Sequence, residues 1–252
     1  MSNMYNSQTY LSQEQISNIQ AMMYKITWRI FGWMFLGVAL TAVSAFAANY
    51  YNLSRYLTRG TVIGLVLVQL AIVFIFSSQV RHARAGIATA MFLVYSIITG
   101  ITFSTLIIFY SGASIVSGFA LSALIFAVMA AFGFLTKRDL SSLGSVGYVL
   151  LFGALLIGVA NIFLHLPMIN LLINYAILAV FIGLTAYDLQ KVRRSVTELV
   201  ARRSSAYRES DVAALDASIR SLSIMYALSL YLDFVNIFIR ILSITGDRRS
   251  SN

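Results

Sequence analysis

Residues 227–242 read ALSLYLDFVNIFIRIL, an apolar stretch with one aspartate, Asp233, near its middle. A charged side chain at the centre of a membrane-spanning helix costs at least about 2.5–3.5 kcal/mol on insertion scales. Asp233 lies about eleven residues into the helix that we predict over residues 222–244, which puts it roughly 16 Å deep. We therefore expect this carboxyl group to face a protein interior or a water-filled path, and not lipid.

Polar side chains around Asp233 recur every three or four residues along the same predicted helix. This spacing places them on one helical face, whereas the other faces carry Leu, Ile, Val, Phe and Ala. The members of this polar stripe are Tyr226, Ser229, Asp233, Asn236, Arg240 and Ser243. The stripe predicts an inner helix with a functional carboxyl group. The alternative is an aspartate that forms hydrogen bonds only to hold the helices together.

The composition of the whole chain indicates an integral membrane protein. Of its 252 residues, 59% are hydrophobic and only 11% are charged, and the mean hydropathy is +0.82. So little charge cannot cover the surface of a soluble domain of this size. Residues 85–136 contain no Asp, Glu, Lys, Arg or His, and residues 140–187 contain only His165. Each stretch is about twice the ~20 residues that one membrane-spanning helix needs.

These patterns predict an all-α bundle of seven transmembrane helices. A β-barrel would need alternating strands of about ten residues, which the sequence does not show. The predicted spans are 27–48, 60–80, 86–109, 113–135, 145–164, 168–189 and 222–244. They form one domain, residues 25–246, between a polar N-terminal tail, residues 1–24, and a C-terminal tail, residues 247–252. The domain includes a basic segment, residues 190–221, between the last two spans.

The distribution of Lys and Arg predicts the orientation. With a cytoplasmic N-terminus, 13 of the 18 basic residues fall on the cytoplasmic side, seven of them in residues 190–221. The positive-inside rule therefore favours this orientation with the C-terminus outside, although a re-entrant last helix would return the C-terminus to the inside. The lack of Cys and the short loops suit a bacterial inner membrane. The net charge of +9 gathers at span ends, which fits anionic lipid headgroups and argues against nucleic acid as a partner.

Several shorter patterns carry structural predictions. Glu198 and Arg202 have the i,i+4 spacing of a helical ion pair, and the Ser210–Asp211 pair is expected to cap the helix that leads into the last span. Asp139, in the turn after the fourth span, is interpreted as a loop ion pair or helix cap. The GTVIG sequence at 60–64 has GxxxG spacing, which fits either close packing inside the bundle or dimerisation. Uncharged polar residues inside the spans are expected to form interhelical hydrogen bonds more often than to line a pore; they are Gln69, Thr99, Thr102 and Asn161.

Four motifs mark the chain: TGITFS at 99–104, TKRDLSSLG at 136–144, LTAYDLQKV at 184–192 and ALSLYLDFVNIF at 227–238. Together they resemble bacterial members of the transmembrane Bax inhibitor motif (Bax inhibitor-1) family, over about residues 25–246. The resemblance implies a seven-helix architecture with a central last helix. It also implies that Asp188 and Asp233 form a pH sensor that controls a calcium leak. In this family an arginine near the end of the second span contacts the pair in the closed form, and the candidates here are Arg81 and Arg84.

The chemistry of such a pair follows from elementary electrostatics. Two carboxyl groups close together cannot both ionise at low cost, so proton binding is expected to control their charge. A nearby arginine favours the charged form, whereas burial favours the protonated form. Carboxylate oxygens also suit Ca²⁺, which would compete with protons for Asp188 and Asp233. Ideal helix rise leaves the two residues at depths that differ by up to about 10 Å, so the sequence leaves open whether they touch.

The leading functional prediction is a pH-sensitive cation (Ca²⁺) leak channel or exchanger, with Ca²⁺ as the transported ion and no bound cofactor. The alternative is a non-transporting membrane protein that regulates a membrane protease or a stress-response partner through residues 190–221. Enzymatic chemistry is not expected. His82 and His165 lie near span ends, and the chain has no Cys, no HExxH, no Walker A motif and no Schiff-base lysine in the last span.

Overall fold

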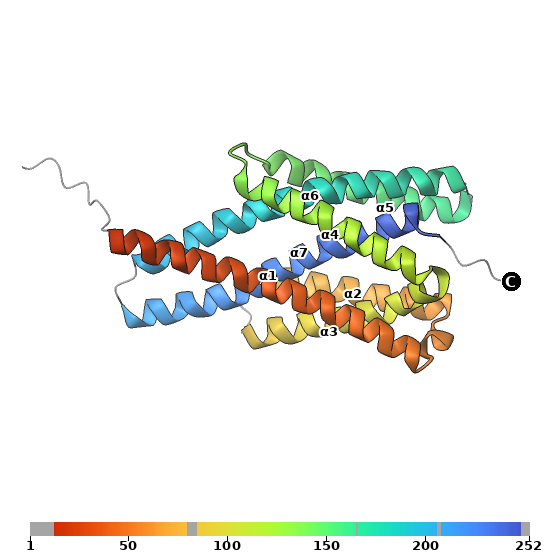
Figure 1. Cartoon of the computed structure of the whole chain (residues 1–252), viewed down its shortest axis with the longest axis horizontal. Helices are drawn as coiled ribbons and strands as arrows, with labels where there is room; N and C mark the ends of the chain where they lie inside the picture. Colours follow the sequence, from red (N-terminus) through yellow and green to blue (C-terminus); the bar gives the residue numbers. More distant parts are fainter. Residues whose placement is uncertain (1–12, 80–84, 165, 206–207, 248–252) are drawn as a thin grey trace, which may run out of the picture.

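The structure is a computed structural model that describes residues 13–79, 85–164, 166–205 and 208–247 (Figure 1). Its helices are α1 (Gln13–Tyr50), the short 3-10 helix η1 (Leu53–Tyr56), α2 (Arg59–Gln79), α3 (Ala85–Phe109), α4 (Gly112–Leu135), α5 (Ser141–Leu164), α6 (Pro167–Ser204) and α7 (Glu209–Thr245). All seven predicted helices are present, and the described residues contain no β-strand. The fold is therefore the predicted all-α bundle.

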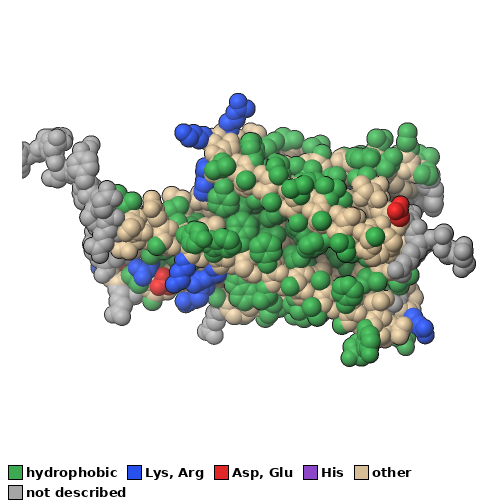
Figure 2. All heavy atoms as spheres, viewed as in Figure 1, with side chains coloured by type: hydrophobic (Ala, Val, Ile, Leu, Met, Phe, Trp, Pro, Cys, Tyr) green, Lys and Arg blue, Asp and Glu red, His purple; other side chains and the backbone are tan. Residues whose placement is uncertain are grey.

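Length and composition identify the helices that can cross a membrane. Among the described residues, every α-helix except α2 contains a long apolar window, which gives 6 candidate spans. The apolar part of α2, Gly60–Phe76, is shorter. Helix α1 begins at Gln13, within the segment predicted as a polar tail. Figure 2 shows the resulting surface, on which hydrophobic side chains dominate the face in view.

Helices α6 and α7 continue well beyond their predicted spans, to 38 and 37 residues. They extend together past the bundle at the end where α1 begins (Figure 1). The predicted ion pair between Glu198 and Arg202 is present, with 2.6 Å between Oε1 and Nη2. The predicted cap by Ser210–Asp211 is wrong, because α7 already begins at Glu209 and Arg208 occupies the N-cap position without a side-chain cap bond.

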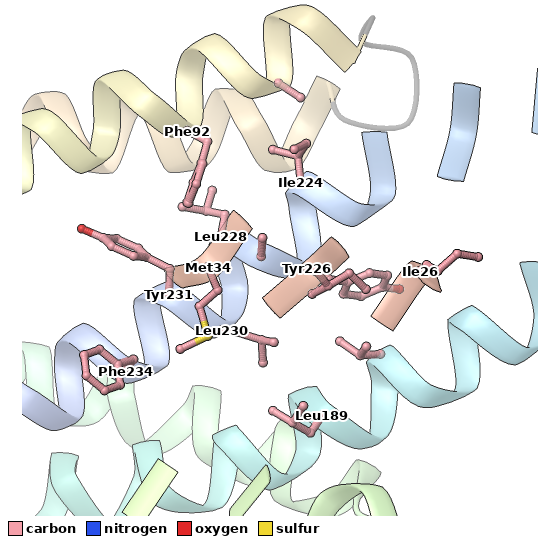
Figure 3. Close-up of a cluster of buried hydrophobic side chains, with 14 of the residues drawn as sticks. Ile26, Met34, Phe92, Leu189, Ile224, Tyr226, Leu228, Leu230, Tyr231 and Phe234 are labelled. Atoms are coloured by element: carbon pink, nitrogen blue, oxygen red, sulfur yellow. The ribbon is translucent and has the colours of Figure 1, made fainter. Parts of the chain in front are cut away.

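Helix α7 is the central helix of the bundle, since it packs against α1, α3, α4 and α6. Of its most apolar window, 67% is buried, compared with 11–33% for the other five candidate spans. Figure 3 shows Met34 of α1, Phe92 of α3 and Leu189 of α6 gathered around the α7 side chains. The ring of Phe92 meets that of Tyr231 edge-on, with 5.7 Å between their centroids. The central position expected for the last helix is thus confirmed.

Glycines set two of the helix crossings. A Cβ atom at Gly133 of α4 would overlap the carbonyl oxygen of Ala186 on α6, and one at Gly100 of α3 would overlap that of Thr41 on α1. Close backbone approach of this kind is how membrane helices gain packing energy. A Cβ at Gly64, in contrast, would meet no atom within 4 Å, so the GxxxG spacing of α2 does not serve close packing inside the described bundle.

Candidate ion-handling site

The two aspartates singled out in the sequence lie on the packed helices α6 and α7. Asp188 is 5% exposed and Asp233 is 4% exposed. Both are therefore inside the protein, although Asp188 stands where the apolar run of its helix gives way to basic residues. The inward orientation expected for Asp233 is confirmed, and Asp188 is equally buried.

Ser229 connects the two acidic positions. Its Oγ donates a hydrogen bond to Asp188 Oδ2. Ser229 and Asp233 are four residues apart on α7, so their Cβ atoms are about 5–6 Å from each other on one face. The helix crossing therefore brings Asp188 to within about one turn of Asp233, which closes most of the depth difference of the ideal-helix calculation. No hydrogen bond joins the two carboxyl groups in the described chain.

Each carboxyl group has one oxygen without a protein partner. Asp188 Oδ1 and Asp233 Oδ2 are buried and accept no hydrogen bond from the described residues. A buried, unpartnered carboxylate oxygen is expensive, because its lost hydration is not replaced. A proton, a water molecule or a cation would each remove this cost. The arrangement can therefore exchange these species at one place.

The polar stripe of α7 faces α6 along most of its length. Tyr226 Oη donates to Ser195 Oγ at 2.5 Å, and Arg240 Nη1 donates to Asn174 Oδ1 at 2.6 Å. Asn236 bonds within its own helix, from Nδ2 to the Leu232 carbonyl oxygen at 2.8 Å. We call the facing polar residues the α6–α7 seam; they are Ser195, Asp188 and Asn174 on α6 with Tyr226, Ser229, Asp233, Asn236 and Arg240 on α7.

Lys191 is the basic residue that follows the acidic position on α6, three residues beyond Asp188 and therefore on a neighbouring part of the same helix face. It was not singled out in the sequence, because a lysine beyond a span is common. Arg81 and Arg84, the predicted arginine contacts of the pair, lie outside the described residues.

The turn between α4 and α5 is fastened to α6 immediately beyond Asp188. Gln190 Nε2 donates to the Arg138 carbonyl at 2.7 Å, and Gln190 Oε1 accepts from the Leu140 amide at 3.0 Å. Arg193 donates to the carbonyl oxygens of Phe134 and Thr136. This clamp fixes the middle of α6, next to Asp188. Sequence inspection did not reveal it, because its acceptors are mostly backbone groups.

Asp139 completes the same turn. Its Oδ1 accepts from the Ser141 amide at 3.0 Å and from the Ser141 hydroxyl at 2.7 Å, and pairs with Arg194 Nη2 at 2.9 Å. These contacts, those of Ser141 first, lower the pKa of Asp139 to about 2. The interpretation of this residue as a loop ion pair is confirmed.

A second polar cluster anchors the opposite face of α7. The Tyr231 hydroxyl lies 2.7 Å from Thr41 Oγ1, and Thr41 donates to the Ser96 carbonyl at 3.0 Å. Nearby, Gln69 Nε2 donates to Thr99 Oγ1 at 2.8 Å, and at the α5–α6 turn Asn161 and Asn170 bond at 2.8 Å. The predicted interhelical role of Gln69, Thr99 and Asn161 is confirmed, whereas Thr102 donates within α3 to the Ile98 carbonyl at 3.0 Å. The Tyr231–Thr41 contact fixes α7 against α1, on the side of α7 away from its acidic face, and the Thr41–Ser96 bond joins α1 to α3.

The described residues of the seam offer two carboxyl groups and a hydroxyl as hard oxygen ligands. No group of three or more His, Cys, Asp or Glu gathers within the described part of the chain. Ca²⁺ normally takes six to eight oxygen ligands. An ion beside Asp188, Asp233 and Ser229 would therefore keep much of its water.

The fold and the seam define an all-α integral membrane protein with a buried acidic pair at its central helix. The chain belongs to the Bax inhibitor-1 family, because the family described as "Inhibitor of apoptosis-promoting Bax1" matches residues 24–250. It is 38% identical over 224 residues to the inner membrane protein YbhL of Escherichia coli K12, covering 88% of this chain and 91% of that protein.

Two further relatives extend the comparison to other bacteria. An uncharacterised protein of Deinococcus radiodurans is 33% identical over 220 residues, covering 87% of this chain and 89% of that protein. One of Borreliella burgdorferi is 30% identical over 225 residues, covering 88% and 91%. The family resemblance found in the sequence motifs is thereby confirmed.

Proposed function

We propose that the protein is a pH-sensitive cation leak channel or exchanger that passes Ca²⁺ and is gated by Asp188 and Asp233. One observation carries the proposal: two buried carboxyl groups lie within about one helical turn of each other, and each has an oxygen without a partner in the described chain. Ionisable groups inside a membrane protein mark ion and proton paths more often than structural contacts. No enzymatic activity and no bound cofactor are part of this proposal.

Gating follows from competition for the unpartnered oxygens. A proton on the pair removes one negative charge and occupies one acceptor position, so a cation is held less well. Loss of that proton restores the charge and the oxygen ligands that attract Ca²⁺. Weak, incomplete coordination is what conduction requires, since an ion must also leave. We place the protein in a bacterial inner membrane with its N-terminus in the cytoplasm. The relative's name and the excess of basic residues on the inner segments support this location.

The test is Ca²⁺ flux into dye-loaded liposomes between pH 5 and pH 8. Wild type should leak in a pH-dependent way, and Asp188→Asn and Asp233→Asn should each change both the flux and its pH profile. Asp211→Asn is the matched control, because Asp211 is an exposed carboxyl group on the same helix as Asp233. Equal flux at every pH for all four proteins would refute the gating role, and no flux from folded wild type would refute the leak.

A second function is favoured by the extension of α6 and α7. This helical pair carries exposed basic residues, among them Arg208 and Arg220. We propose that a membrane protease or another stress-response protein docks there if the chain regulates without transport. Replacing both Arg208 and Arg220 by Gln should then abolish the cellular effect while any flux stays intact. A cellular effect that survives this double substitution but is lost with Asp233→Asn would favour the leak.

A further inference from the structure

Arg240 is a cation inside the bundle whose charge the described residues do not neutralise. Among the described residues it forms a hydrogen bond with a neutral group, from Nη1 to Asn174 Oδ1 at 2.6 Å, and its buried Nε has no partner there. The ion pairs of the described chain all lie toward the other end of α6 and α7; they are Arg194–Asp139, Arg202–Glu198 and Arg203–Asp216. A fixed positive charge therefore remains in the seam.

The position of Arg240 relates this charge to the acidic pair. Arg240 follows Asp233 by seven residues, so it lies on the same face of α7, two turns and roughly 10 Å farther along. On α6 the sequence of facing groups is Ser195, Asp188 and then Asn174. A cation that enters the seam from the α6–α7 extension meets the carboxyl groups first and the guanidinium afterwards.

We propose that Arg240 is an electrostatic barrier that limits the rate at which cations pass along the α6–α7 seam. The inference rests on the leak proposed above and adds a residue that sets its rate and its preference among ions. A positive side chain in a narrow, low-dielectric path repels cations strongly, and transport proteins use such groups to restrict passage. Asn174 holds the guanidinium in the seam through its amide oxygen without cancelling its charge.

Ion valence separates this role from a purely structural one. A divalent ion feels twice the electrostatic repulsion of a monovalent ion at the same place, so the barrier slows Ca²⁺ by about the square of the factor by which it slows K⁺. A loosened contact between α6 and α7 would instead raise the flux of both ions by similar factors. The ratio of the two fluxes is therefore the informative quantity.

The experiment compares Ca²⁺ and K⁺ flux through reconstituted wild type, Arg240→Gln, Arg240→Lys and Asn174→Asp. Arg240→Gln should raise K⁺ flux about threefold and Ca²⁺ flux about tenfold, whereas Arg240→Lys, which keeps the charge, should show a much smaller rise. Asn174→Asp places a carboxylate against the guanidinium with almost no change of shape, so it should act in the same direction as Arg240→Gln. Arg220→Gln is the matched control, an exposed arginine of α7 outside the seam.

The outcomes distinguish the two proposals. If wild type conducts and the substitutions leave the ratio of Ca²⁺ to K⁺ flux unchanged, the barrier role is overturned and the leak stands. If wild type and every variant are folded by gel filtration and helical by circular dichroism yet pass neither ion, the leak itself fails and the inference fails with it. If Arg240→Gln does not fold, Asn174→Asp decides the question in the same way.

Discussion

The hydrogen bond from Ser229 to Asp188 makes a quantitative prediction about the charge inside the seam. Interhelical hydrogen bonds in membranes contribute about 0.6 kcal/mol on average, whereas hydrogen bonds to charged groups contribute about 1.5–3 kcal/mol. Ser229→Ala leaves Asp188, which is 5% exposed, without this donor. We therefore expect Ser229→Ala to lower the free energy of unfolding by about 1–2 kcal/mol.

A double-mutant cycle isolates the contact. In a background of Asp188→Leu, which has a similar shape and no acceptor, Ser229→Ala should cost less than about 0.5 kcal/mol. In a background of Asp188→Asn the cost should lie between these values, because a neutral hydrogen bond contributes about 0.5–1.5 kcal/mol. Reversible unfolding in mixed micelles measures the free-energy cost of Ser229→Ala in the wild-type, Asp188→Leu and Asp188→Asn backgrounds. If Ser229→Ala costs the same in all three backgrounds, Ser229 acts through packing and the Ser229–Asp188 bond does not link the two acidic positions.

The remaining predictions concern stability and can be measured by thermal unfolding in detergent. The pKa of Asp139 lies at about 2, below its ordinary 3.8, so its contacts stabilise the folded state above about pH 4. That contribution is lost as the pH falls toward 2, and Asp139→Asn should destabilise at pH 6 but progressively less toward pH 3; an unchanging difference would contradict the assignment. Tyr231→Phe should cost about 1 kcal/mol in the wild type but little in a Thr41→Val background, where the partner of its 2.7 Å contact is already absent; equal costs in both backgrounds would exclude that coupling. Gly100→Ala should destabilise by about 1–3 kcal/mol through overlap with the Thr41 carbonyl, whereas Gly153→Ala, with no neighbour within 4 Å, should be neutral or stabilising; equal effects would argue against close packing of α1 on α3.

Much of the fold could be predicted from the sequence because few backbone structures can cross lipid. Charge-free runs fixed the number of helices, and the spacing of polar residues around Asp233 identified the buried face of α7. The start of α7 was misplaced, since Ser210–Asp211 resemble a cap locally while the helix continues back to Glu209. The preference of single residues for the N-cap position is easily outweighed by the packing of the extended helices.

The candidate site was predicted less completely than the fold. Asp233 was found because a carboxyl group inside an apolar run is conspicuous, and Asp188 was assigned through the family resemblance, but the separation of the two was not predicted. It depends on where α6 crosses its neighbours, and that is set by contacts such as Gly133 against Ala186. Asn174 and Ser195 were missed because single amides and hydroxyls are ordinary in such helices, and only a facing partner gives them a role.

The close contact of Gly133 with the Ala186 backbone also gives α6 a point about which the helix can pivot. The part of α6 from Ala186 to Ser204, in the extension, is about 27 Å long, and the part from Ala186 back to Asn174 is about 18 Å long. Asp188 lies only about 3 Å along the helix from this pivot at Ala186. A sideways push of about 2 Å at Ser204 would hardly move Asp188 but would swing Asn174 by roughly 1.3 Å the other way. A sideways displacement of the extension would thus first lengthen or break the 2.6 Å contact between Asn174 and Arg240, on the other side of the pivot.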